Sequence, residues 1–375
     1  MNRREVLQAA AAAALLATTA SAWGQAGRGA GRPGVVVAQI VDVSAAQQDV
    51  SRDFLIGSRA AWQDINSTGG LRGRPVKHLT LEVDGRPDSL RQALATLRDT
   101  PSCVALSGSA GDPVAMQLVT ALRQEKLGLA HAAPWLQNSS VAVDDDTFPI
   151  FSGRQEQISH ALRSLSLVGV QEIGAIYATA ADHALYHADL ERSATTLKLR
   201  LVTFKSQGDL SRLGHQLGAS TPPLLLFVGG TPELVQFTQG LERQARQRYV
   251  VTLADVNLQT LMQLGGIRST SVINTQPVPM VTAGLPVVRD YRATLARLFD
   301  EPPTQLSLAG YIAARYTFSV LDGTDVTLTR ASALAAFRRR DAMDLGGFRV
   351  AFDAQRRSAN FVTQTLLTSE GRVIG

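Results

Sequence analysis

Residues 60–75 read AAWQDINSTGGLRGRP and connect a predicted helix to a predicted strand. Small and apolar residues recur at helical spacing through 53–66, which indicates an amphipathic helix. The glycine-rich end of the stretch, 69–75, predicts a turn, and the apolar run 76–83 that follows predicts a strand. Another apolar run, VVVAQIV at 35–41, precedes the helix. Together these segments form a βαβ unit, the building block of a parallel sheet.

The same alternation of strands and helices continues through most of the chain. Further strands are predicted at 103–106, 127–132, 172–177, 200–204, 224–228, 249–253, 271–276, 348–352 and 361–368. Further helices are predicted at 89–99, 113–125, 158–167, 183–197, 210–217, 232–243, 286–299, 307–321 and 331–340. Because 375 residues exceed what one hydrophobic core usually organises, we expect an α/β protein with two domains.

Residues 1–22 are typical of an export signal. Arg3 and Arg4 provide a positive start, a run rich in Ala and Leu follows, and small residues end the segment. Both the twin-arginine route and the general secretory route fit this pattern. We expect removal of the signal, a flexible leader at 23–34, and a soluble protein located in the periplasm.

Composition and charge narrow the functional classes. The formal net charge is +5, yet the arginines are scattered rather than grouped with aromatic residues, so no nucleic-acid binding is expected. Cys103 is the only cysteine, so an internal disulfide is impossible and the fold must depend on its core. A lipid-anchored form is not expected, because no cysteine follows the first apolar run.

The sequence predicts neither a catalytic site nor a metal site. No nucleophile, base and acid occur at a recognisable spacing, so we expect no enzyme activity and no cofactor. His183 and His187 lie four residues apart on a predicted helix, but two surface histidines fit better than a metal pair because no third ligand is evident. The glycines of 29–34 match a dinucleotide motif, yet they precede the first strand, where that motif cannot work. The acidic run 144–146 lacks the spacing of a calcium loop.

One turn has the features of a ligand contact. Residues 108–113, GSAGDP, follow the predicted strand that ends at Leu106. Asp112 and Pro113 predict a helix start with Asp112 as the N-cap. Backbone N–H groups at such a start can bind a carboxylate, and parallel sheets bind ligands at this end of their strands. An ordinary strand-to-helix turn is the alternative.

Several motifs, taken in order, support a more specific interpretation. The stretch 60–75 has the form A-x-x-x-I-N-x-x-G-G-x-x-G-R-P. The segments that continue the series are Gly108-Ser109, Phe151-Ser152-Gly153-Arg154, Gly229-Gly230, 274–279, 307–311 and 345–353. This series resembles the branched-chain-amino-acid-type (Leu/Ile/Val-binding-like) substrate-binding proteins of ABC transporters, which have the type I periplasmic binding fold. The resemblance runs from residue 35 to the end.

The resemblance implies two Rossmann-like lobes with parallel central sheets, joined by a three-crossover hinge, with the ligand between them. Lobe 1 would comprise 35–152 and 280–343, and lobe 2 would comprise 153–279 and 344–375. The ligand-contacting residues that it implies are Ser109, Ala110, Ala130, Ala132, Ala133, Asp182, His183, Thr231, Asp255 and Val256. In amino-acid binders of this family the first two turns bind the α-carboxylate, and an acid of the second lobe pairs with the ammonium. That acid would be Asp255, although a loop-capping role is the alternative.

Departures from the family's pattern bear on the expected ligand. Ala130 and Pro134 stand where the family has a Ser/Thr pair, which removes two hydroxyl donors. Asp182-His183 replaces a Tyr-Gly pair, and Ala309 replaces a glutamate. Aromatic acids, amides and other small organic acids therefore join the amino acids as expected ligands.

The implied function is solute capture without catalysis. Hinge closure around a small polar solute, an amino acid or a related organic acid or amide, would precede delivery to the permease of an ABC transporter in the inner membrane. We expect a monomer. A periplasmic sensor that presents its ligand to a signalling receptor is the alternative, and neighbouring permease and ATPase genes would favour transport.

Overall fold

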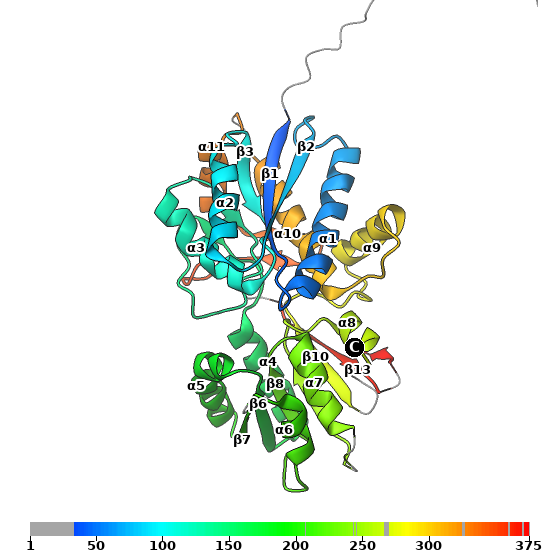
Figure 1. Ribbon diagram of the computed structural model, residues 1–375. Helices are drawn as coiled ribbons and strands as arrows, with labels where there is room; N and C mark the ends of the chain where they lie inside the picture. Colours follow the sequence, from blue (N-terminus) through cyan, green and yellow to red (C-terminus); the bar gives the residue numbers. More distant parts are fainter. Residues whose placement is uncertain are drawn as a thin grey trace, which may run out of the picture. The chain divides into compact units, whose positions relative to one another are not determined.

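The computed structural model describes residues 34–206, 208–242, 244, 246–265, 270–324, 327–358, 361–369 and 371–374. The predicted signal, 1–22, and all of the predicted leader except Gly34 lie outside the described residues. The described strands form two main sheets and one short hairpin (Figure 1). We call each main sheet, with the helices packed on it, a lobe.

The first lobe contains a five-stranded parallel sheet in the order β2-β1-β3-β4-β5. Its strands are β1 (Val35–Asp42), β2 (Val76–Val83), β3 (Cys103–Ser107), β4 (Ala130–Ala132) and β5 (Thr147–Phe148). Its helices are α1 (Gln48–Ser67), α2 (Pro87–Arg98), α3 (Asp112–Glu125), α9 (Pro286–Leu298), α10 (Gln305–Asp322) and α11 (Arg330–Arg338). Alternate residues of β1 enter two different cores: Val35 and Val37 pack with α1 and α10, whereas Val36 and Ala38 pack with α2 and α3. Both faces of the sheet are therefore covered, as a parallel sheet requires.

The second lobe contains a seven-stranded sheet in the order β14-β13-β10-β9-β8-β6-β7. The parallel strands are β6 (Glu172–Tyr177), β7 (Arg200–Lys205), β8 (Leu224–Val228), β9 (Tyr249–Thr252) and β10 (Ser271–Gln276). The antiparallel strands β13 (Thr363–Leu367) and β14 (Val373–Ile374) extend one edge. One core includes residues of α4 (Arg154–Leu167) and α5 (Ala180–Thr196), and the other includes residues of α6 (Leu210–Gln216), α7 (Thr231–Leu241) and α8 (Leu258–Gln263).

The C-terminal segment differs from its predicted structure and from the expected lobe boundary. The strand predicted at 348–352 is reduced to the two residues of β12 (Arg349–Val350), which pair with β11 (Met343–Asp344). Phe348 and Val350 are buried in the core of the first lobe, although the boundary expected from the resemblance assigns 344–375 to the second. Only β13 and β14, from Thr363 onward, join the sheet of the second lobe.

The glycine-rich stretch 69–75 forms the turn that its sequence predicts. The Asn66 side chain fixes both sides of this turn, because its amide donates to the Val76 carbonyl and accepts from the Val76 N–H, each at 2.8 Å. Gly70 has a φ of 68°, and a Cβ there would lie 2.1 Å from the Arg74 carbonyl oxygen. Glycine is therefore required for the chain to return directly into β2.

Two glycines allow α1 and α10 to cross in close contact. A Cβ on Gly57 would lie 1.6 Å from the Ser307 carbonyl oxygen, and a Cβ on Gly310 would lie 1.8 Å from the Phe54 carbonyl oxygen. The Ser58 hydroxyl lies 3.1 Å from the carbonyl oxygens of both Phe54 and Gly310, to which it donates, and it accepts a hydrogen bond from the Gln39 amide of β1 at 3.1 Å. The first turn of α1 lies beside the second lobe, where Asp49 accepts a hydrogen bond from Thr231 at 2.7 Å. Among the described helices, none has the length and apolar character needed to cross a membrane.

Candidate functional site

A cavity of about 220 Å³ lies where strands of both lobes end. The first lobe contributes the loop after β1, the first turn of α3 and one loop residue beyond β4, and the second contributes the first turns of α4, α5 and α7 and the loop after β9. The lining residues are Ala46, Gln47, Asp112, Pro113, Met116, Asn138, Arg154, Ala178, Thr179, Asp182, Leu185, Tyr186, Gly229, Gly230, Glu233 and Asp255. Open α/β sheets bind ligands at the carboxyl ends of their strands, so this cavity is the candidate site.

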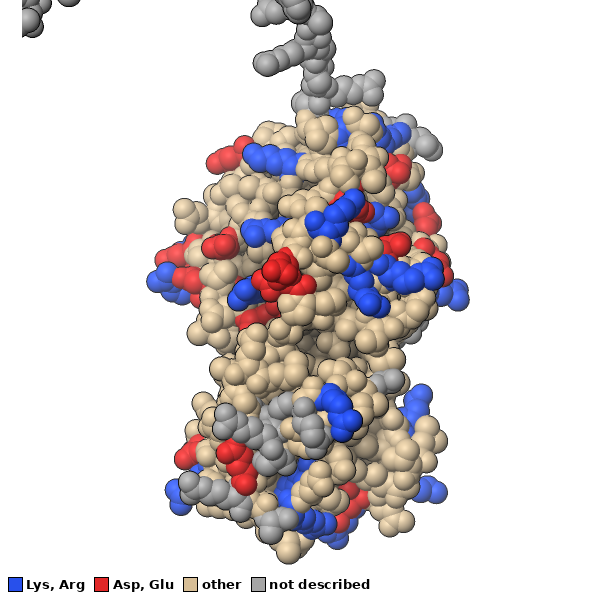
Figure 2. Space-filling view, turned by 90° about the vertical axis from the view of Figure 1, so that its right-hand side faces the viewer, with Lys and Arg blue, Asp and Glu red and all other residues tan. Residues whose placement is uncertain are grey.

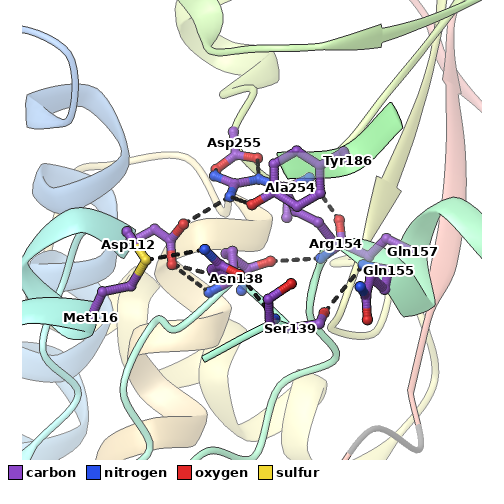
Figure 3. Close-up of polar contacts among 12 residues, drawn as sticks. Asp112, Met116, Asn138, Ser139, Arg154, Gln155, Gln157, Tyr186, Ala254 and Asp255 are labelled. Atoms are coloured by element: carbon purple, nitrogen blue, oxygen red, sulfur yellow. Dashed lines mark hydrogen bonds and ion pairs between the residues drawn. The ribbon is translucent and has the colours of Figure 1, made fainter. Parts of the chain in front are cut away.

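Arg154, the first residue of α4, is at the centre of the polar contacts in this cavity (Figure 3). Its Nε and Nη2 donate to the two carboxylate oxygens of Asp255 at 2.6 and 2.5 Å. Its Nη1 donates to Asp112 at 2.8 Å and to the Tyr186 hydroxyl. The guanidinium also lies over the Tyr186 ring, with Cζ 5.1 Å from the ring centroid. Arg154 therefore links the two lobes, because Asp112 belongs to the first lobe and Asp255 to the second.

Asp112 has a different role from the N-cap that its sequence context predicts. Gly111, with a φ of 105°, is the N-cap of α3, and no side chain caps this helix. One carboxylate oxygen of Asp112 instead accepts from the backbone N–H groups of Gln137 and Asn138 at 2.8 and 3.1 Å, and the other accepts from Arg154. Asp112 thus connects the start of α3 to the loop after β4 and to the second lobe.

Burial dominates the electrostatics of this group. The Arg154, Asp112 and Asp255 side chains are only 13%, 4% and 11% exposed. Burial by itself lowers the pKa of Arg154, but the charges of Asp255 and Asp112 outweigh it and hold that pKa well above its usual value. Burial raises the pKa of Asp112 even though Arg154 and two backbone N–H groups oppose the rise. Burial also raises the pKa of Tyr186 to about 12, so its hydroxyl stays protonated and can donate a hydrogen bond.

Two further carboxylates line the cavity from the first turns of α5 and α7. Asp182 forms a capping box with Thr179, whose backbone N–H and hydroxyl both donate to the same carboxylate oxygen. Burial raises the pKa of Asp182. Glu233 occupies the third position of α7. Neither carboxylate forms an ion pair with a described residue, in contrast to Asp112 and Asp255.

The structure brings two of the predicted ligand contacts, Asp182 and Asp255, to the cavity wall. It places the predicted first-lobe contacts elsewhere: Ser109, Ala110, Ala130, Ala132 and Ala133 are fully buried and do not line the cavity. The Ala110 backbone is used within the lobe, because its N–H donates to the Ile40 carbonyl and its carbonyl accepts from the Asp42 N–H, both at 2.9 Å.

The Ser109 side chain is also engaged inside the first lobe. Its hydroxyl lies 2.7 Å from Nε2 of His131, a residue of β4 that is itself fully buried. Burial lowers the pKa of His131 to about 3, so the ring is neutral at physiological pH. The Ser109–His131 pair is therefore a neutral contact of the core.

The remaining predicted contacts belong to the second lobe and have other partners. The Thr231 hydroxyl donates to Asp49 of α1 at 2.7 Å and accepts from the Asn257 N–H at 2.9 Å, so it joins the two lobes. His183 packs against Tyr177 with ring centroids 4.9 Å apart, outside the cavity lining. Val256 is fully buried in the second lobe.

A larger cavity, of about 540 Å³, lies against α1, α8 and the loop before α10. Asp49 and Asp53 of α1 line it, and burial raises the pKa of each. The Asn257 amide donates to Asp53 at 3.1 Å and to the Asp49 carbonyl at 3.2 Å, which adds to the Thr231 contact between the lobes. Most of its wall comes from helix sides and a loop, so the smaller cavity, into which several strands lead, remains the candidate site.

Sequence reasoning assigned no ligand role to Arg154, Tyr186 or Glu233. In the sequence Arg154 occurs only as the last residue of a matched motif. Its position as a basic residue directly at the expected boundary between the lobes is the signal that could have indicated a role in the site. Glu233 follows a Gly-Gly turn at a strand end, which is a usable signal. No three His, Cys, Asp or Glu side chains of the described residues gather in a way that could hold a metal ion.

Comparison with known proteins agrees with this geometry. Residues 34–366 match the family of periplasmic binding proteins. Among similar solved structures, an extracellular ligand-binding receptor from Verminephrobacter eiseniae has a TM-score of 0.81 at 19% identity, covering 92% of this chain and 100% of that chain. A possible leucine/isoleucine/valine-binding protein from Rhodopirellula baltica has a TM-score of 0.77 at 16% identity, covering 91% and 96% of the two chains.

A fatty acid ABC transporter substrate-binding protein from Thermomonospora curvata has a TM-score of 0.75 at 13% identity, covering 91% of this chain and 90% of that chain. At these identities the similarity shows the fold alone. No curated protein sequence matches the chain. The predicted α/β fold with two lobes and the family resemblance are both confirmed: the chain belongs to the periplasmic binding protein family, with the type I fold of the leucine/isoleucine/valine-binding kind.

Proposed function

We propose that the chain is the periplasmic solute-binding component of an ABC-type uptake system and that the 220 Å³ cavity holds its solute. One observation carries this proposal. The cavity is lined by strand-end residues of both lobes, and its charged groups are Asp112 from one lobe and Arg154, Asp182, Glu233 and Asp255 from the other. A solute in this position contacts two separate bodies at once.

Such contacts provide the mechanism of capture. A solute that touches both lobes favours the arrangement in which they lie together, by the difference between its affinities for the two arrangements. Arg154–Asp112 and Thr231–Asp49 already form contacts between the lobes. The solute adds to these contacts and makes the closed arrangement the recognisable signal for a permease.

The size and polarity of the cavity define the class of solute. About 220 Å³ lined by five charged side chains suits a small polar molecule and disfavours a long apolar chain, because burying ionised groups against hydrocarbon is costly. The Thermomonospora curvata relative is named for a fatty acid. A shared fold therefore does not imply a shared ligand, and the side chains that line each cavity determine which ligand it binds.

A thermal-shift screen of amino acids, amines, amides and organic acids against the purified protein tests solute binding. We expect at least one compound to raise the midpoint temperature, and calorimetry should then give a one-to-one complex. Tyr186→Ala should weaken that complex at least tenfold. Tyr249→Ala should not weaken it, because Tyr249 is the first residue of β9 and the cavity lies beyond the other end of that strand. Absence of any stabilising compound, or equal effects of both variants, would contradict the proposal.

Transport requires a separate test. Deletion of the gene should abolish uptake of the labelled solute by intact cells, and expression of the protein should restore it. Normal uptake together with loss of a transcriptional response to the solute would instead support a periplasmic sensor.

A further inference from the structure

The charge of the cavity differs from that of the protein. The whole chain has a formal net charge of +5, and acidic and basic side chains are interspersed over the face shown in Figure 2. The cavity lining contains four carboxylates, Asp112, Asp182, Glu233 and Asp255, against a single basic residue, Arg154, which gives a formal charge of −3. The solute cavity of this basic protein therefore carries a negative formal charge.

The only cation of the lining is already neutralised. Arg154 uses Nε and Nη2 for Asp255 and Nη1 for Asp112 and Tyr186. These contacts engage four of the five N–H groups of the guanidinium, so a carboxylate of a solute would have only the second Nη2–H available unless it displaced a buried partner. The unpaired charges that remain for a solute are the carboxylates of Asp182 and Glu233.

The helix N-termini at the cavity are also occupied. Four helices, α3, α4, α5 and α7, begin at its wall, and the positive end of a helix dipole normally attracts an anion. Helices α3, α5 and α7 each carry a lining carboxylate in the first turn, Asp112, Asp182 and Glu233, respectively. Helix α4 begins with Arg154, which pairs with Asp112 and Asp255. Stabilisation of the helix accounts for Asp182, which closes a capping box, but Glu233 makes no such hydrogen bond among the described residues.

The wall already shows how a cation is held there. The guanidinium of Arg154 lies over the face of Tyr186, 5.1 Å from its centroid, while carboxylates contact its edges. An aromatic face combined with carboxylates is a favourable environment for organic cations. The predicted carboxylate-binding turn at Ser109 and Ala110, by contrast, is buried away from the cavity.

We propose that this cavity binds a small organic cation, an alkylamine or a guanidine, that carries no carboxylate group. The inference rests on the proposed function, because the cavity is taken as the solute site of a binding protein. The family resemblance implies an amino acid, which carries both charges, or an organic acid, which is negative. The proposed solute instead carries a positive charge and no negative one. Solutes that differ only in the carboxylate group provide the discriminating comparison.

Calorimetric titration of the exported protein, purified from the periplasm, with matched pairs of compounds tests the proposal. The pairs are agmatine and arginine, putrescine and ornithine, and 3-methylbutylamine and leucine, with 4-methylpentanoate as the anionic member. We expect at least one amine to bind, and to bind at least tenfold more tightly than its carboxylate-bearing partner. Tighter binding of the amino acid or of 4-methylpentanoate, or no binding by any amine, overturns the proposal.

A pair of variants localises the effect. Glu233→Gln removes a cavity charge with almost no change in shape, and we expect it to weaken amine binding about tenfold. Glu172→Gln is the control, because Glu172 begins β6, away from the cavity, and pairs with Arg200. Equal affinity of the Glu233→Gln variant and the unmodified protein for the amine overturns the assignment of the cation to this cavity.

Different results would contradict the cationic class of the solute and solute binding itself. Binding of a carboxylate-bearing or neutral solute that Tyr186→Ala weakens overturns the cationic class and leaves solute binding intact. A protein that no compound of the broad thermal-shift screen stabilises would contradict the function itself.

Discussion

Replacement of Arg154 by methionine is the most informative perturbation of the contacts between the lobes. Methionine preserves most of the side-chain volume and removes the charge that both Asp112 and Asp255 share. Asp112 keeps two backbone N–H donors, whereas Asp255 has hydrogen bonds only to Arg154 among the side-chain contacts described. The variant therefore leaves one partly satisfied and one unsatisfied carboxylate, both nearly buried.

Breaking a buried ion pair by removing one partner costs about 3–5 kcal/mol, and we expect about 4 kcal/mol here. Arg338→Met is the matched control, because Arg338 pairs with Asp146 at 2.6 Å with side chains 51% and 30% exposed. An exposed pair contributes at most about 1 kcal/mol. The two arginines thus form similar ion pairs in different environments, and the difference of about 3 kcal/mol measures the effect of burial.

The deficit of the Arg154→Met variant should depend on pH. In the intact protein burial raises the pKa of Asp112 and Arg154 opposes that rise, so removal of Arg154 raises the pKa further. The folded variant then takes up a proton more readily than the folded wild type as the pH falls, and protonation removes the unpaired charge. We expect the destabilisation to be largest at pH 7.5 and smaller at pH 5.

Urea unfolding followed by the fluorescence of the buried Trp62 and Trp135 measures these free energies. Asp255→Asn in the Arg154→Met background should recover part of the loss, because it removes the unsatisfied charge. A loss below about 1 kcal/mol, or one equal to that of Arg338→Met at both pH values, would refute the assignment of Arg154 as a buried link between lobes.

Three further outcomes follow from the structure. In urea titrations, Gly310→Ala should lower the free energy of unfolding by about 3 kcal/mol or more, because its Cβ would lie 1.8 Å from the Phe54 carbonyl oxygen. Gly218→Ala, whose Cβ would meet nothing within 4 Å, should change that free energy by less than about 0.5 kcal/mol. Cys103 should react with a thiol reagent at pH 8 only after unfolding, since burial raises its pKa; rapid reaction of the native protein would show an accessible thiolate. His131 stays neutral when folded but has an ordinary pKa when unfolded, so its stabilising contribution should fall by about 2 kcal/mol between pH 7 and pH 5, and His131→Gln should unfold with a correspondingly weaker dependence on pH.

The sequence predicted most of the fold because each lobe is built from local patterns. The alternation of apolar runs and amphipathic stretches located most of the strands, and the turn chemistry of 69–75 was confirmed in detail. Elements that escaped prediction are too short to show a period: β5 has two residues and α8 has six. Residues 344–352 were assigned to the wrong lobe because an apolar run does not show which core its side chains enter, and only tertiary packing decides between the two.

The candidate site was predicted only in part, for a physical reason. Asp182 and Asp255 follow strands, so their place at the strand ends could be inferred from order along the chain. The partners of Arg154 lie 42 and 101 residues away in the sequence, and nothing local indicates that they meet. Asp112 looked like an N-cap because a helix does start there, but its carboxylate turns to the loop after β4 instead. Pairings that form where two lobes meet leave no periodic signal.

A crystal structure of the protein with the tightest-binding compound of the screen would show whether the solute lies between the two lobes. We expect electron density for the compound within the cavity lined by Asp182, Tyr186 and Glu233, with contacts to at least one first-lobe residue such as Asn138. Density for the compound against one lobe only, or in the larger cavity beside α1 and α8, would contradict it.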